Sequence, residues 1–200
     1  RAIAVLSDIA VSGKTTGQRK LAIMSISTRP GEPAVDALFR IYDADHSPEI
    51  RRAVIYGFAN RKSERAGAKL VEIARSTDNL ELRKAAINAI SRRGGDKAID
   101  SLLGLYDSEK NEELKDQILN SLGNGTQFYV TTPAAEPGQT IVGYPARTAS
   151  RVDDQRVITK LIEIARNPKE PMERRKRAIG WLSRSKDPKV LEFLQELLKQ

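Results

Sequence analysis

The stretch that decides the fold is RKAAINAI at residues 83–90, because it recurs along the chain at an even spacing. Related stretches are RKLAIMSI at 19–26, RRAVIYGF at 51–58, KDQILNSL at 115–122 and RKRAIGWL at 175–182. The first four copies follow one another at equal intervals, and the fifth comes after an interruption. A fixed period of this size predicts a repeat architecture in which each unit stacks on the next.

Each repeat reads as two helices joined by a short turn. Apolar residues recur at helical spacing on both sides of turns such as Asp43 to His46, and Ser47-Pro48 is typical of a helix start. We therefore expect one repeat domain over residues 1–200. Its predicted parts are four units at about 1–31, 32–63, 64–95 and 96–126, a fifth at 149–187, and a terminal half-unit at 188–200.

The period fails after the fourth unit, where an insertion at 127–148 delays the next helix. Two short β-rich runs flank a segment of Pro and Gly, which predicts a β-hairpin near residues 127–145. The insertion carries the aromatic residues Phe128, Tyr129 and Tyr144. Two interpretations stay open: the hairpin offers an edge strand to a bound peptide, or it covers the weak fourth unit.

Composition narrows the function classes only slightly. The chain has a formal net charge of +8 and a pI near 9.8, which keeps nucleic acid among the possible partners. The charge is uneven, since residues 1–31 hold five basic and one acidic side chain while residues 96–126 hold three and seven. A protein that tracks phosphates usually presents an unbroken basic stripe. The absence of cysteine excludes disulfides and thiolate chemistry, and no apolar run approaches the length of a membrane span.

The repeat resembles the bacterial short HEAT-like repeats, also known as PBS-lyase-type repeats. Ile50-Arg51 with Ala53-Val54-Ile55, and Leu82-Arg83 with Ala85-Ala86-Ile87, carry the resemblance best. It covers the chain apart from about residues 126–148 and weakens at Lys115 and Gln117. The resemblance implies an all-α fold, a right-handed α-α superhelix of the HEAT-like solenoid type, whose second helices line a concave surface. It also implies a scaffold that binds proteins, as most of the family does.

One column of side chains on the second helices is the predicted partner-binding site. It consists of the residue after each repeated arginine and the residue four positions further on, which share a helical face outside the core stripe. This column is also the polar face of any amphipathic helix, so a purely solvated surface is the alternative. The residues predicted to bind a partner are Met24, Arg52, Tyr56, Lys84, Asn88 and Lys176.

The repeated arginines themselves are predicted to be structural. By the HEAT resemblance, Arg19, Arg51, Arg83 and Arg175 are expected to pair with acidic turn residues such as Asp45 and Asp78. His46 is the single histidine, and we expect no metal or cofactor there. We also expect Trp181 to belong to the core rather than to a nucleic-acid surface.

These observations predict a non-enzymatic protein-interaction scaffold without catalytic residues, metal or cofactor. The first alternative is a nucleic-acid-binding protein of the DNA-repair type. The second is a passive spacer within a longer chain, because Arg1 already lies inside a predicted helix and suggests an excised piece. We expect a soluble bacterial protein, and its compartment is left open between the cytoplasm and the periplasm or export. The oligomeric state is also left open.

Overall fold

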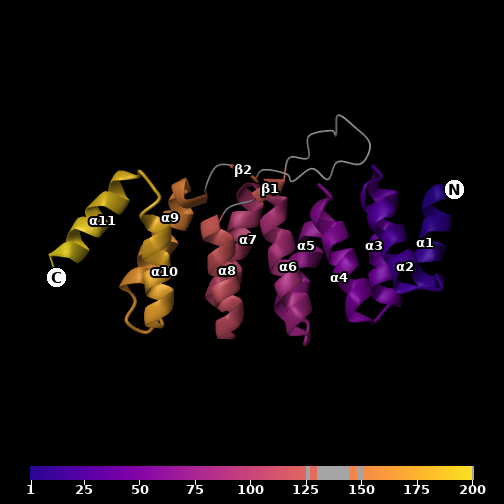
Figure 1. Cartoon of the computed structure of the whole chain (residues 1–200), viewed down its shortest axis with the longest axis horizontal. Helices are drawn as coiled ribbons and strands as arrows, with labels where there is room; N and C mark the ends of the chain where they lie inside the picture. Colours follow the sequence, from indigo (N-terminus) through magenta and orange to yellow (C-terminus); the bar gives the residue numbers. More distant parts are fainter. Residues whose placement is uncertain (125–126, 130–144, 148–150, 200) are drawn as a thin grey trace. The chain divides into compact units, whose positions relative to one another are not determined.

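The computed structural model describes residues 1–124, 127–129, 145–147 and 151–199. These residues form two compact units, Arg1–Gln117 and Ile118–Gln200. Figure 1 labels the helices in chain order. The helices are α1 (Ala2–Ser12), α2 (Thr16–Ser27), α3 (Glu32–Ala44), α4 (Pro48–Ala59), α5 (Glu64–Ser76), α6 (Leu80–Arg93), α7 (Gly95–Ser108), α8 (Glu112–Asn124), α9 (Gln155–Arg166), α10 (Met172–Leu182) and α11 (Pro188–Leu198), with a 3-10 turn η1 (Arg151–Asp153). The predicted all-α architecture is confirmed.

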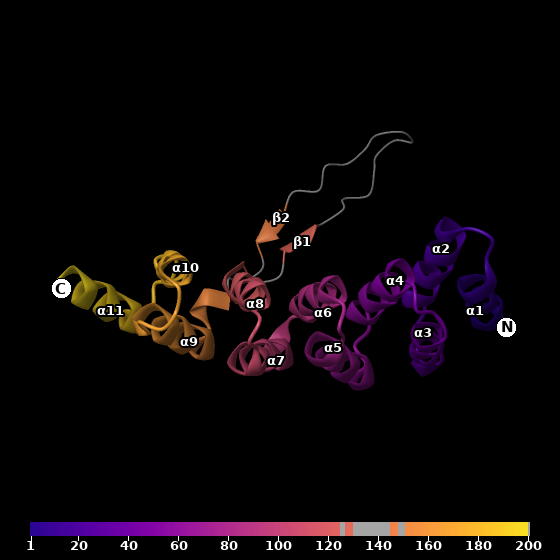
Figure 2. The same ribbon diagram turned by 90° about the horizontal axis from the view of Figure 1, so that it is seen from below.

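In the first unit the helices form two layers. Figure 2 shows the first helices α3, α5 and α7 in one layer and the second helices α2, α4 and α6 in the other. Within the second layer, α2 packs against α4 and α4 packs against α6. The first layer joins α1 to α3 and α5 to α7. These helices thus pack against their partner in the same repeat, and most of them also against their counterpart in a neighbouring repeat.

Local sequence signals set the helix ends. Pro48 occupies the first turn of α4, where its missing N–H costs no hydrogen bond. Gly94 ends α6 with a φ of 66°, a left-handed conformation that suits glycine. The N-cap of α6 is Asn79, whose side chain accepts a hydrogen bond from the Leu82 N–H at 3.1 Å. Asp78 and Glu81 have the spacing of a capping box, which predicts Asp78 as the N-cap, one residue before the observed cap.

The core of the first unit follows the repeat period. Leu38, Leu70 and Leu102 occupy the same position in successive repeats and are fully buried. Helices also approach closely beside Gly57, where an added Cβ would lie 3.1 Å from Cδ2 of Leu38. A larger side chain there would push α4 away from α3. The period observed in the sequence is therefore a period of buried positions.

The second unit combines the end of α8 with η1, α9, α10 and α11. Trp181 of α10 is 9% exposed and lies against Gly123 of α8. This places Trp181 in the core, as its position on the apolar stripe predicts. The prediction of a single continuous domain over residues 1–200 stays a prediction.

The start and end of the insertion pair as two three-residue strands. Strands β1 (Gln127–Tyr129) and β2 (Pro145–Arg147) are antiparallel, with Phe128 opposite Ala146. Phe128 and Tyr129 belong to β1, while Tyr144 falls outside the described residues. The connection that would complete the hairpin also falls outside them, so the hairpin stays a prediction.

Candidate functional site

The repeated arginines, which we call the first arginine ladder, hold each unit together at its turn. In three of them, the Nε–H donates to a carbonyl at the end of the preceding first helix. These bonds run from Arg19 to Ala10 at 2.8 Å, from Arg83 to Ala74 at 2.7 Å and from Arg175 to Ala165 at 3.0 Å. The Nε–H of Arg51 donates instead to the Asp45 carbonyl, inside the turn, at 2.8 Å.

The same arginines also connect neighbouring units. The guanidinium of Arg19 forms an ion pair with Asp45, and that of Arg83 forms one with Glu109. In the repeat between these two acids, the matching position holds Thr77, which carries no charge. Arg51 contacts the ring of His46 in its own turn instead. Asp78, the expected partner, lies one residue past the matching position and takes no part in these contacts.

Arg61 and Arg93 form a second arginine ladder, which the sequence pattern above does not predict. The guanidinium of Arg61 donates to the carbonyls of Ser27, Arg29 and Gly31, and that of Arg93 to those of Phe58, Arg61 and Ser63. Burial lowers the pKa of the Arg93 side chain. The signal that could have found this ladder is the recurrence of arginine at 29, 61 and 93, with the same period as the first ladder.

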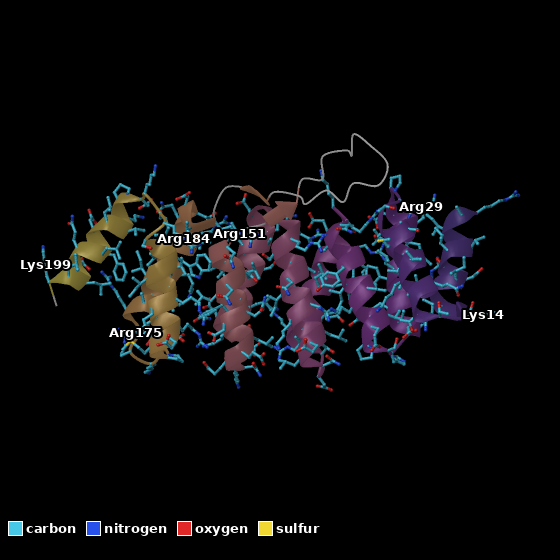
Figure 3. The ribbon with its side chains drawn as sticks, in the orientation of Figure 1. Lys14, Arg29, Arg151, Arg175, Arg184 and Lys199 are labelled. Atoms are coloured by element: carbon cyan, nitrogen blue, oxygen red, sulfur yellow. The ribbon has the colours of Figure 1, made fainter. Side chains whose placement is uncertain are left out.

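The second unit contains arginines at both ends of its helix pair. Arg151 donates to the Ser121 carbonyl at 2.8 Å and is 6% exposed. Figure 3 shows Arg151 and Arg184 at one end of this helix pair and Arg175 at the other. The guanidinium of Arg184 lies over the Trp181 ring, 4.4 Å from its centroid. We interpret these arginines as parts of the packing rather than as ligand-binding groups.

Two residues of the predicted partner-binding column, Lys84 and Asn88, bind side chains of the neighbouring helix α8. The Nζ of Lys84 lies 2.9 Å from Glu81 on its own helix and 2.5 Å from Glu113 on α8. Hydrogen bonds to Glu113 and Glu81 hold the pKa of the Lys84 ammonium above its usual value. The side chain of Asn88 accepts a hydrogen bond from the amide of Gln117 on α8 at 2.6 Å. Both residues therefore connect second helices to each other.

The rest of the column in the first unit consists of Met24, Arg52 and Tyr56. Tyr56 lies between two guanidiniums, those of Arg52 at 5.9 Å and Arg92 at 5.8 Å from the ring centroid. One helix away, Met24 is 58% exposed and occupies the position equivalent to Tyr56 in the preceding repeat. We call these residues, together with the exposed Lys20, the Tyr56 patch. Its members are Lys20, Met24, Arg52, Tyr56 and Arg92.

Lys176 belongs to the second unit and is described separately. Its Nζ forms an exposed ion pair with Glu173 at 3.0 Å. Nearby Arg174 is 3% exposed and pairs with Glu170 at 2.7 Å. The basic run around Trp181 is thus partly buried and ion-paired, which argues against a nucleic-acid surface at this place.

Among the described residues, no group of three or more His, Asp or Glu side chains could hold a metal ion. His46, the single histidine, contacts Arg51. Within the same part of the chain, no helix combines the length and the apolar character that crossing a membrane requires.

Comparison with known proteins identifies the repeat. A family model described as HEAT repeats matches residues 35–123. The solved structure of human deoxyhypusine hydroxylase in complex with glycerol has a TM-score of 0.54 to this chain at 20% identity. That match covers 99% of this chain and 67% of the human chain. No curated protein matches the chain in sequence.

The structural match corrects one expectation from the sequence. The resemblance to scaffold repeats predicts a non-enzymatic chain. The human protein with the same fold is named as a hydroxylase, so this architecture accommodates catalysis. The fold therefore gives no ground for excluding an enzyme. At 20% identity the match transfers the fold and nothing of that protein's chemistry.

Proposed function

This chain is a HEAT-like repeat protein, and from that premise we propose that it binds a protein partner through the Tyr56 patch. HEAT repeats commonly mediate protein interactions, because stacked helices present an extended surface that grows with each unit. The observation that carries the proposal is a half-buried tyrosine beside two exposed arginines, with the exposed Met24 at the equivalent position of the adjacent second helix.

The composition of the Tyr56 patch supports a protein partner. Tyr, Met and Arg are enriched at the centres of protein interfaces, and Tyr and Arg are frequent hot spots. Met24 exposes more than half of its surface, which gives a partner apolar area to bury. A polar band without these side chains would offer hydrogen bonds but little hydrophobic free energy.

Contacts between helices around the Tyr56 patch hold the patch helices in place. Lys84 and Asn88 connect α6 to α8 on the side of the patch toward the next repeat. The second arginine ladder fixes the ends of α2 and α4 through Arg61 and Arg93. A partner that binds to helices already held in place loses less conformational entropy than one that must order them.

Peptide selection tests this proposal with a matched control. A displayed library of random peptides would be selected against the wild-type chain and then measured on two double variants. The patch variant is Met24→Ala with Arg52→Ala. The control is Leu191→Ala with Arg40→Ala, which also removes one exposed apolar side chain and one exposed arginine. Circular dichroism melting would show whether both variants are folded.

We expect the selected peptides to bind the control like the wild type and the patch variant about tenfold more weakly. That ratio corresponds to about 1.4 kcal/mol, a modest loss for interface residues. A failure to enrich peptides, or peptides that bind both double variants alike, would contradict the proposal.

A further inference from the structure

The cations of the Tyr56 patch differ from Arg19, Arg83 and Lys84 on the same second helices because no carboxylate contacts them directly. Lys20, Arg52 and Arg92 are exposed, and none forms an ion pair within 4 Å with a carboxylate in the described part of the chain. Lys84, at the equivalent position of the next repeat, is held by two glutamates. Arg52 and Arg92 share the Tyr56 ring, so two positive charges are available to a ligand at one place.

The Tyr56 ring arranges two of these charges for carboxylate binding. The guanidiniums of Arg52 and Arg92 lie over the ring at 5.9 and 5.8 Å, from helices α4 and α6. A cation over an aromatic face is attracted to the ring. The guanidinium keeps its N–H donors in its own plane, where they can bind a carboxylate in a bidentate manner.

An acidic row borders the patch at the starts of the second helices. Glu49 and Glu81 occupy the first turns of α4 and α6, where the helix macrodipole favours negative charge. The hydrogen bond from Lys84, with a smaller effect of the Arg52 charge, holds the pKa of the Glu81 carboxyl below its usual value. A negatively charged ligand would therefore lie over the later turns, next to Tyr56 and Arg92.

The apolar part of the patch distinguishes a peptide from a nucleic acid. Met24 lies on α2, the helix next to α4, and its apolar side chain gains nothing from phosphate groups. The glutamate row on the other side would repel a continuous phosphate backbone. A peptide can place one apolar side chain on α2 and its carboxylates on α4 and α6.

We propose that the partner segment is an acidic peptide with one apolar side chain, bound across α2, α4 and α6. This inference rests on the proposed function and adds the chemical class of the partner. Neighbouring helix axes are about 9 Å apart, so the patch spans about 18 Å. An extended chain covers that distance with about six residues.

Fluorescence anisotropy with defined peptides tests the inference. The probe is a labelled peptide of about eight residues, made of Glu and Ser around one Leu, with its length set by the span above. One control peptide carries Gln for every Glu, and a second carries Ser for the Leu. Labelled duplex DNA serves as the nucleic-acid probe. The protein variants are Arg52→Gln and Arg92→Gln, with Arg40→Gln on α3 as the matched charge control.

We expect the acidic peptide to bind at least about tenfold more tightly than either control peptide. Arg52→Gln and Arg92→Gln should each weaken it about threefold, and Arg40→Gln should leave it unchanged. Three results would overturn the inference: equal binding of the Glu and Gln peptides, equal losses in Arg40→Gln and Arg52→Gln, or DNA binding tighter than peptide binding through the same arginines.

The two proposals can fail separately. If the peptides selected from the library depend on the Tyr56 patch but are neutral or basic, the acidic partner is wrong and the protein-binding function survives. If no peptide depends on the patch in either experiment, both proposals are wrong.

Discussion

The contact between Gly123 and Trp181 gives the sharpest test of the packing. A Cβ added to Gly123 would lie under 3.0 Å from three atoms of the Trp181 ring, a rigid group in the core. A Cβ added to Gly180, on α10, would meet nothing within 4 Å. The same substitution, glycine to alanine in a helix, should therefore have opposite effects at the two positions.

The magnitudes follow from packing and helix propensity. Overpacking a core costs about 1–3 kcal/mol, and alanine gains about 0.8 kcal/mol over glycine inside a helix. Gly123→Ala should lower the free energy of unfolding by about 1–2 kcal/mol, since the clash exceeds the propensity gain. Gly180→Ala should raise it by about 0.5–1 kcal/mol, since only the propensity gain remains.

Urea unfolding measures both changes. Trp181 is the single tryptophan, so its fluorescence reports on the second unit, and circular dichroism reports on all helices. In a Trp181→Leu background, followed by circular dichroism, the penalty of Gly123→Ala should shrink because the ring is gone. A Gly123→Ala variant as stable as the wild type, or an unchanged penalty without the ring, would refute the reasoning.

Two further predictions concern the charged contacts. Arg93→Met removes hydrogen bonds to three carbonyls and should lower the free energy of unfolding in urea by about 2 kcal/mol. Arg92→Met, at an exposed position, should change it by no more than about 0.5 kcal/mol. Equal losses would contradict a special role for the second ladder. The Arg156 side chain donates to Asp154 and holds the pKa of that carboxyl below its ordinary value of 3.8. Because the folded-state pKa is lowered, the charge stabilises the fold above the ordinary pKa, and this contribution is lost as the pH falls through the folded-state pKa. Asp154→Asn should therefore be less stable than the wild type by about 0.5 kcal/mol at neutral pH, and the difference should close in acid unfolding series below pH 3.8; a difference that grows in acid would show the sign to be wrong.

Much of the fold could be predicted because its signals are local. The helices carry the same apolar spacing in every repeat, and residues such as Pro48 and Gly94 mark their ends. The capping-box spacing predicts the cap of α6 one residue too early, because Asp and Asn are both good N-caps and stand side by side at 78 and 79. The fifth helix pair can be predicted after the insertion because residues 175–182 keep the repeated sequence pattern.

The candidate site could be predicted only in outline. The helical face that carries Met24, Tyr56 and Lys84 follows from spacing along each second helix. Arg92 was missed because it lies a full helical turn beyond the column, and the Tyr56 ring that it covers belongs to another repeat. The expectation of a non-enzymatic protein failed for a different reason: one fold can serve both scaffolds and enzymes.

The sequence by itself determined that this chain is a stack of helix pairs, which side of each helix is buried, and where the helices end. These properties depend on residues within a few positions of one another. Only the tertiary structure decided which surface charges are engaged. Lys84 pairs with Glu113 and Asn88 bonds to Gln117 on the next second helix, while Arg52 and Arg92 contact the Tyr56 ring. Such pairings depend on how far each helix slides along its neighbour, which the core packing fixes and the local sequence pattern does not.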